Sequence, residues 1–132
     1  MPAYVLVDSS AWIEAMRPGG DPLFRAAVTE ALRRREAAVC EVVAAEILRG
    51  ARDARELALL QADLATPEHL SMTGTAHLAG QLALSLRQQG LAIPTTDLLV
   101  AATASLHGAS LLHCDKHLDL AAAELGVPVV EP

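Results

Sequence analysis

Apolar residues in this chain follow two patterns, short continuous runs and longer segments with helical spacing. The runs at 4–7 and 37–40 are continuous, which is typical of strands buried on both faces of a parallel sheet, and 109–114 has a similar character. Weaker strand signals occur at 70–72 and 127–130. The pattern therefore predicts a sheet of four to five strands.

Helical spacing occupies the stretches between these runs. Helices are predicted near residues 11–17, 22–35, 42–49, 57–64, 73–89, 97–107 and 119–125. We expect Ser9 and Ser10 to cap the first helix and Thr96 to cap the helix after Pro94. The alternation of strands and helices predicts an α/β fold, a three-layer α/β/α sandwich with a mainly parallel central sheet.

The composition fits a single domain over residues 1–132, because 52% hydrophobic content is ample for one core. A formal net charge of -6 argues against nonspecific attraction to nucleic acid. Nucleic acid stays open as a substrate if metal ions offset an acidic cleft. Cys40 and Cys114 have no CxxC spacing, which favours reduced thiols.

The chain carries no recognisable address for export or for a membrane. Its N-terminus has no basic leader, and the apolar run at 4–7 is too short for a signal-peptide core. No stretch of about 18 uninterrupted apolar residues occurs either. We therefore expect a cytoplasmic protein that does not bind membranes.

Four acidic residues stand where an open parallel sheet forms its sites, at the carboxyl ends of the strands. Asp8 directly follows the first predicted strand, and Asp115 follows the strand at 109–114. Asp97 opens the helix upstream of that strand, and Glu46 lies on the helix after the second strand. These four carboxylates are predicted to converge on one edge of the sheet.

Carboxylates held close together repel, so a divalent cation would stabilise such a cluster. Mg²⁺ or Mn²⁺ suits oxygen ligands and can activate water beside a phosphodiester, so the pattern indicates metal-assisted phosphodiester hydrolysis. Each acid also has a structural explanation. Asp8 suits a turn, Asp97 the dipole of a helix, Asp115 a helix cap and Glu46 a solvated helix face.

Other chemistries fit the sequence less well. A phosphatase with an aspartyl nucleophile would have a second Asp two residues after Asp8, where this chain has Ser10. No GxGxxG or GxxxxGKS loop is present for a nucleotide. His113, Cys114 and His117 form a short cluster, but strand alternation sends the first two to opposite faces, which disfavours zinc.

Four segments in order resemble the PIN-domain toxins of the VapC family, and together they span the chain from Leu6 to about Val130. The segments are Leu6-Val7-Asp8-Ser9-Ser10-Ala11-Trp12-Ile13, Ala44-Ala45-Glu46-Ile47-Leu48-Arg49-Gly50, Thr96-Asp97-Leu98-Leu99-Val100-Ala101-Ala102-Thr103-Ala104 and Leu111-Leu112-His113-Cys114-Asp115-Lys116-His117-Leu118. One departure is Leu118, where the family often has an aromatic residue; the change is conservative because that residue should pack rather than react.

The resemblance implies a PIN-like fold and an endoribonuclease that cleaves single-stranded regions of RNA with Mg²⁺ or Mn²⁺. Asp8, Glu46, Asp97 and Asp115 match the family's metal-binding and catalytic acids. Ser10 matches a hydroxyl position beside the first acid. Asp119 is an open case between an extra acid and a solvated turn. Glu41, which precedes the Glu46 helix, is a second open case, in which a role at the helix start is favoured over a role at the metal.

The resemblance also implies partners. Such a protein acts as the toxin of a toxin-antitoxin pair and forms a homodimer. Its antitoxin tail would lie in a groove that Trp12, Ile13 and Leu48 are expected to line, although core packing is the alternative for Trp12. The basic residues nearest the acidic motifs, Arg49, Arg52 and Lys116, are candidates for contacts with RNA phosphates. The rival reading is a catalytically silent PIN-like binding domain.

Overall fold

The computed structural model describes residues 3–132. Met1 and Pro2, the first residues of the segment predicted to carry no basic leader, lie outside the described residues. A four-stranded sheet forms its centre, with strand order β3-β2-β1-β4 and every neighbouring pair parallel. The strands are β1 (Val5–Val7), β2 (Ala37–Val39), β3 (Glu68–His69) and β4 (Ser110–Leu112). In the register of β1 with its two neighbours, Leu6 lies opposite Ala38 on β2 and Leu111 on β4.

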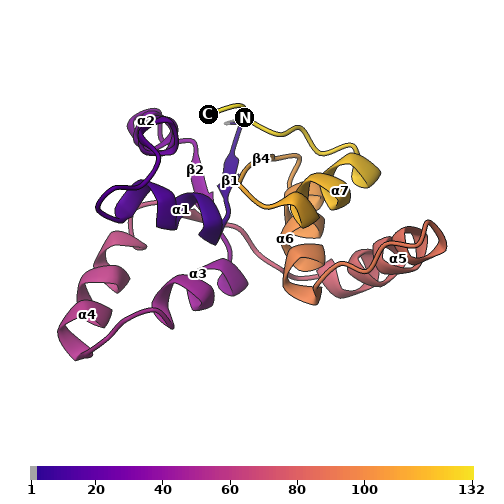
Figure 1. Cartoon of the computed structure of the whole chain (residues 1–132), viewed down its shortest axis with the longest axis horizontal. Coiled ribbons are helices and arrows are strands. Elements are labelled where there is room, and N and C mark those ends of the chain that lie inside the picture. The colour runs from indigo at the N-terminus through magenta and orange to yellow at the C-terminus, as the bar shows by residue number, and fades with distance from the viewer. Residues whose placement is uncertain (1–2) are drawn as a thin grey trace.

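Seven helices connect and cover the strands over the described residues. They are α1 (Ser9–Met16), α2 (Pro22–Arg33), α3 (Glu41–Leu48), α4 (Ala54–Asp63), α5 (Thr75–Gln88), α6 (Thr95–Leu106) and α7 (Lys116–Leu125). Figure 1 shows α1 to α4 on one side of the strands and α5 to α7 on the other. This is the predicted α/β/α sandwich, at the lower bound of its expected strand number.

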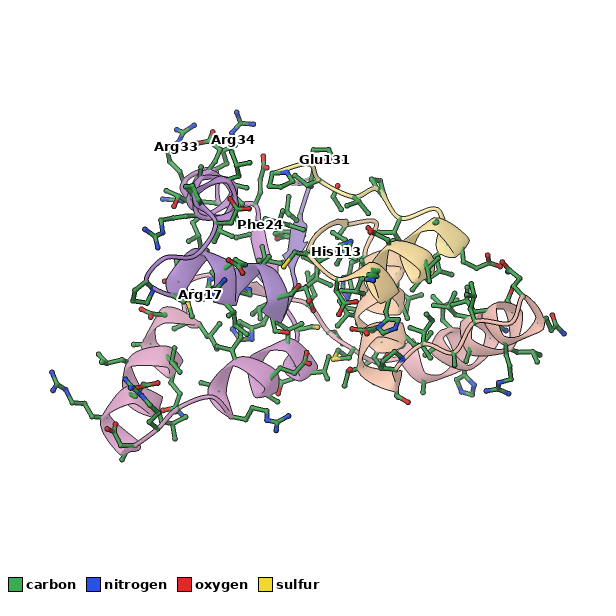
Figure 2. The ribbon with its side chains drawn as sticks, viewed as in Figure 1. Arg17, Phe24, Arg33, Arg34, His113 and Glu131 are labelled. Atoms are coloured by element: carbon green, nitrogen blue, oxygen red, sulfur yellow. The ribbon has the colours of Figure 1, made fainter. Side chains whose placement is uncertain are left out.

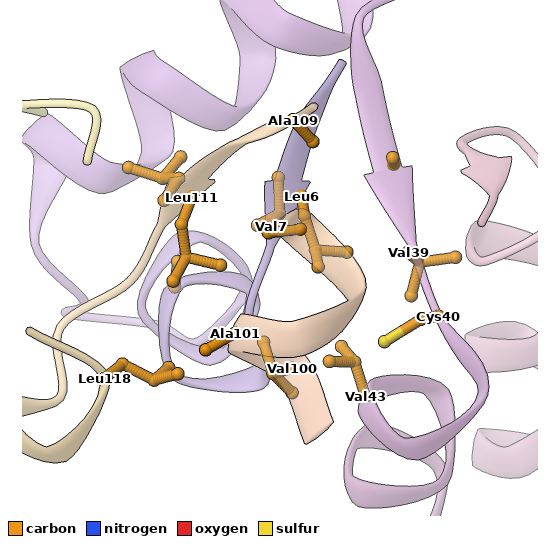
Figure 3. Packing of buried hydrophobic residues seen from close by; sticks show 14 of the residues in the cluster. Leu6, Val7, Val39, Cys40, Val43, Val100, Ala101, Ala109, Leu111 and Leu118 are labelled. Atoms are coloured by element: carbon orange, nitrogen blue, oxygen red, sulfur yellow. The ribbon is translucent and has the colours of Figure 1, made fainter. Parts of the chain in front are cut away.

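The core is built from small aliphatic side chains, as the low aromatic content requires. Leu6, Val39, Val100 and Leu111 are fully buried, and Ala101 on α6 lets that helix approach the sheet closely (Figure 3). The central strands are short but buried on both faces, which explains why their sequence is continuous rather than alternating.

Two predicted strands differ in the structure. The edge strand expected at 70–72 lies at Glu68–His69 instead, because backbone pairing with β2 selects two exposed polar residues that have no apolar pattern. The strand expected at 127–130 is reduced to one bridge between Val129 and Leu111. Pro128 has no N–H to donate there, so the ladder does not extend.

Several helix starts also differ from prediction. Asp8, not Ser9 or Ser10, caps α1 through a bond from Ser10 N. Pro94 rather than Thr96 is the N-cap of α6, without a side-chain bond. The last helix begins at Lys116 rather than at 119, because Asp115 caps it through His117 N. No helix over the described residues has the length and apolar content to cross a membrane.

Candidate metal centre at the carboxyl edge of the sheet

Parallel strands bring the carboxyl ends of β1, β2 and β4 to the same edge, and the four predicted acids lie around it. Asp8 follows β1, Asp115 lies beyond β4, and Glu46 comes from the second turn of α3 after β2. Asp97 is the third residue of α6 and approaches from the amino end of that helix. The sheet topology therefore brings together positions that are distant along the chain.

Asp8 is buried, with 3% of its surface exposed, and its position is fixed by a neighbouring hydroxyl. The Ser10 hydroxyl donates to Asp8 Oδ2 at 2.6 Å, and Ser10 N donates to the same oxygen at 3.1 Å. The Ser10 Oγ in turn accepts the Cys114 N–H at 3.1 Å. This hydroxyl therefore connects the loop after β4 to the first acid.

Asp97, Asp115 and His117 form the tightest group. One ligand atom from each lies within 4.8 Å of the other two. His117 Nδ1 is 3.8 Å from Asp97 Oδ2 and 3.6 Å from Asp115 Oδ1. An imidazole between two carboxylates is a donor set that a divalent cation can use.

Electrostatics link the other acids to this group. Burial raises the pKa of Asp97 to about 6, and the charges of Asp115, Asp8 and Glu46 add to the rise, while His117 opposes it. Burial and the charge of Asp8 likewise raise the pKa of Glu46, and a bond of 3.3 Å from the Ser9 hydroxyl acts in the opposite direction. The four acids therefore lie close enough to influence one another's ionisation, and His117 and Arg49 offset part of their negative charge.

The remaining predicted acids lie outside this group. Asp119 is an exposed residue of α7 whose Oδ1 is 3.0 Å from His113 Nε2, so it contacts a histidine rather than the other carboxylates. Glu41 is exposed at the first position of α3, where its negative charge interacts favourably with the helix dipole. His113 is buried and Cys114 is exposed beside Ser10, and within residues 3–132 these two do not join His117 in a metal-binding group.

His117 was not among the residues predicted for the site. The sequence signal that could have found it is its place two residues after Asp115, in the first turn of α7. The sequence pattern predicted the start of this helix three residues too late, at 119. The contact of His117 with Asp97 depends on α6 packing against α7, which no local pattern reveals.

The three basic candidates differ in their surroundings. Arg49 is exposed one turn after Glu46, and its charge lowers the pKa of that acid. Lys116 is exposed beside Asp115. Arg52 is an exposed residue whose Nε is 2.9 Å from Glu56 Oε2 on α4. Arg33 and Arg34, by contrast, project from the end of α2, where both bind Glu30 (Figure 2).

Of the three residues predicted to line a partner groove, one lines a cavity in the structure. A cavity beside the site is lined by Ile13, Met16, Arg17, Glu46, Ile47, Gly50, Glu56 and Leu60. Trp12 is 4% exposed and belongs to the core, which is the alternative left open for it. Leu48 is half-buried and is not among the residues that line the cavity. Ile13, with 47% of its surface exposed, is the predicted residue that lines it.

The family model of the PIN domain matches residues 5–124, a range that contains all four acids. The chain belongs to the PIN domain family. No curated protein matches this PIN domain in sequence.

Solved structures share the PIN-domain fold over nearly the whole chain. VapBC2 from Rickettsia felis, bound to a promoter DNA fragment, gives a TM-score of 0.76 at 17% identity, over 97% of both chains. FitAcB from Neisseria gonorrhoeae gives 0.74 at 18% identity, also over 97% of both chains. The sarcin-ricin loop cleaving toxin VapC20 from Mycobacterium tuberculosis gives 0.59 at 21% identity, over 97% of this chain and 99% of that chain. At these identities the likeness shows the fold.

Proposed function

We propose that this PIN domain is a Mg²⁺- or Mn²⁺-dependent endoribonuclease that cleaves single-stranded regions of RNA. The observation that carries the proposal is the grouping of Asp8, Glu46, Asp97 and Asp115 at one edge, where burial, and after it repulsion by the other three acids, raises the pKa of Asp97 to about 6. A site that raises the pKa of its own carboxylates is poised to exchange protons for a cation.

The donor set fits a hard divalent ion. Carboxylate oxygens predominate, with one imidazole at His117, and no thiolate belongs to the group of three found within residues 3–132. Oxygen-rich sites of this kind suit Mg²⁺ and Mn²⁺ better than a structural zinc ion, which is held mainly by Cys and His. We propose Asp8, Asp97, Asp115 and Glu46 as the residues that hold the ion.

An ion held by these four acids would supply the activation of a water and the neutralisation of charge on the scissile phosphodiester. Side chains of the protein orient the acids. Ser10 keeps the Asp8 carboxylate fixed, and Ser9 does the same for Glu46. His117 Nδ1 lies 3.8 Å from Asp97 Oδ2 and 3.6 Å from Asp115 Oδ1, where an unprotonated nitrogen would be a third donor to the ion. Ser10 therefore acts as an auxiliary residue that orients an acid.

RNA would meet basic side chains at the rim of the site. Arg49 and Lys116 are exposed and adjoin Glu46 and Asp115 along the chain, so they are the favoured phosphate contacts. Arg52 is already paired with Glu56, and this ion pair would have to open before Arg52 could bind a phosphate. The net charge of -6 means that affinity must come from the ion and these few residues.

We further propose that the protein is the cytoplasmic toxin of a toxin-antitoxin pair and forms a homodimer. The fold is shared with chains from the VapBC2 and FitAcB complexes and with the VapC20 toxin. The cavity beside the site is lined mainly by apolar residues such as Ile13 and Leu60, together with Glu46, Glu56 and Arg17. An amphipathic antitoxin tail could pack its apolar face there and direct basic side chains to the two glutamates.

A cleavage assay on single-stranded RNA tests the proposal against the rival of a catalytically silent PIN-like domain. Cleavage is expected with Mg²⁺ or Mn²⁺, and EDTA should abolish it. Asp8→Asn and Asp97→Asn should each lower the rate by at least about 100-fold, because a lost ligand removes the ion rather than one contact. Asp63→Asn, at an exposed carboxylate on the last residue of α4, is the matched control and should cleave normally. Full activity of either site variant contradicts the proposed function.

A further inference from the structure

His113 is a buried polar residue that the proposed chemistry does not use. Its side chain is 2% exposed, and it lies in the loop between β4 and α7 (Figure 2), two residues before Asp115. A buried imidazole must satisfy two ring nitrogens, so the partners of each nitrogen show what the residue is doing there.

The first nitrogen holds the backbone of a site acid. Asp115 N donates to His113 Nδ1 at 3.0 Å. A backbone N–H can only donate, so Nδ1 must be the unprotonated acceptor and the neutral ring carries its proton on Nε2. This bond closes a turn across two residues, the geometry that Asx side chains commonly provide.

The second nitrogen faces an acid from the next helix. His113 Nε2 lies 3.0 Å from Asp119 Oδ1, out of line for a hydrogen bond, and has no hydrogen-bond partner among the described residues. The negative charge of that carboxylate favours the proton on Nε2 and hence the acceptor role of Nδ1. The same tautomer excludes His113 Nε2 as a metal ligand, because a protonated nitrogen has no lone pair to offer.

The turn that His113 closes sets the direction of Asp115. That residue is the N-cap of α7, and its Oδ1 accepts His117 N at 2.8 Å. Its backbone is therefore fixed on one side by His113 and its carboxylate on the other by the first turn of α7. Partners that orient metal ligands in this way commonly contribute 10- to 100-fold in metal affinity or activity.

We propose that His113 is a positioning residue of the metal site, which fixes Asp115 through Nδ1 while Asp119 selects the required tautomer. The inference rests on the proposed function, and it assigns Asp119 a supporting role rather than that of a fifth acid at the ion.

Two substitutions at His113 test the acceptor role. His113→Leu removes the acceptor and fills the same space with an apolar side chain of similar bulk. His113→Asn keeps an oxygen that can accept the Asp115 N–H in an Asx turn. We expect His113→Leu to raise the Kd for Mn²⁺, measured by EPR, about 10-fold and to lower kcat for RNA about 10- to 100-fold, with KM unchanged. His113→Asn should stay within about 3-fold of wild type in both, even if it unfolds more readily. Equal losses in the two variants, or no loss in either, would overturn the proposal.

Asp119→Asn separates the supporting role from direct ligation. Asparagine removes the charge that favours the proton on Nε2 but removes no proposed ligand, so Mn²⁺ affinity and kcat should each fall by no more than about 10-fold. Loss of both, comparable to that of Asp97→Asn, would make Asp119 a ligand and overturn the assignment.

Long-range ¹⁵N NMR of the wild-type ring in EDTA gives a readout independent of metal and RNA. Nδ1 should show the ¹⁵N chemical shift of an unprotonated nitrogen and Nε2 that of a protonated one. The reverse pattern would overturn the inference. Failure of the proposed function looks different, because wild type would then show this pattern yet neither bind Mn²⁺ nor cleave RNA.

Discussion

The Ser10 hydroxyl donates a hydrogen bond of 2.6 Å to Asp8 Oδ2, and the same oxygen of Ser10 accepts the Cys114 N–H. One small side chain thus connects the end of β1 to the loop after β4, the two segments that carry Asp8 and Asp115. The arrangement resists the repulsion between these acids, because it fixes both loops to each other.

Ser10→Ala should therefore reduce both stability and cleavage. It removes a bond to a buried carboxylate and leaves the Cys114 N–H without its acceptor, so we expect a loss of about 1.5–3 kcal/mol in the free energy of unfolding. If Asp8 holds the proposed ion, the cleavage rate should also fall about 10- to 100-fold, the usual cost of losing a residue that orients a metal ligand. Urea denaturation and an RNA cleavage assay measure the two effects.

Ser85→Ala is the matched control for this prediction. Ser85 also donates to a carboxylate, that of Glu124, but the pair is exposed at the surface. Its loss should cost little stability and leave cleavage unchanged. If Ser10→Ala and Ser85→Ala behave alike, Ser10 has no special role in the site.

The raised pKa of Asp97 makes the stability of the metal-free protein depend on pH. In the unfolded chain this carboxyl ionises near 3.8, while the folded protein retains the proton to about pH 6. The folded state therefore binds more protons between these values, and stability falls as pH rises from about 4 to 6. At pH 7.5, Asp97→Asn should be more stable than wild type by about 1–3 kcal/mol in EDTA.

Saturating Mn²⁺ should reverse that order. Wild type then gains binding free energy, about 2.7 kcal/mol at a metal concentration 100 times Kd, and Asp97→Asn gains far less. Thermal melts at pH 4.5 and 7.5, with EDTA and with Mn²⁺, check both statements. The prediction is contradicted if, in EDTA, the stability difference between wild type and Asp97→Asn is the same at both pH values. Such a result would mean that burial and repulsion do not raise the pKa of Asp97.

The loop between α1 and α2 contains a glycine that no other residue can replace without movement. A Cβ on Gly20 would lie 1.9 Å from the backbone oxygen of Glu14, a contact with main chain that a side-chain rotation cannot relieve. Gly20→Ala should therefore cost about 2–3 kcal/mol of stability, as overpacked sites commonly do. Chemical denaturation measures the change.

Gly80→Ala provides the opposite sign. Gly80 is exposed inside α5, and a Cβ there meets nothing within 4 Å. Alanine has the better helix propensity, so this variant should gain about 0.5–1 kcal/mol. A Gly20→Ala protein as stable as Gly80→Ala would show that the Glu14 backbone can move at no cost.

Local sequence patterns predicted best the parallel strands that are buried on both faces. The runs that became β1, β2 and β4 were found because strands covered on both faces must be apolar throughout. They also located Asp8 and Asp115, since an acid after a buried strand marks its carboxyl end. β3 was placed wrongly because Glu68 and His69 are both exposed and pair only through the backbone.

The sequence by itself determined the α/β alternation, the PIN-domain motifs and the four acids, because each depends on residues adjacent in the chain. Only the tertiary structure decided that His117 lies between Asp97 and Asp115, that His113 turns one nitrogen to the Asp115 backbone, and that Trp12 is buried in the core. These contacts arise from the packing of α6, α7 and the sheet, and packing joins residues whose separation along the chain carries no local signal.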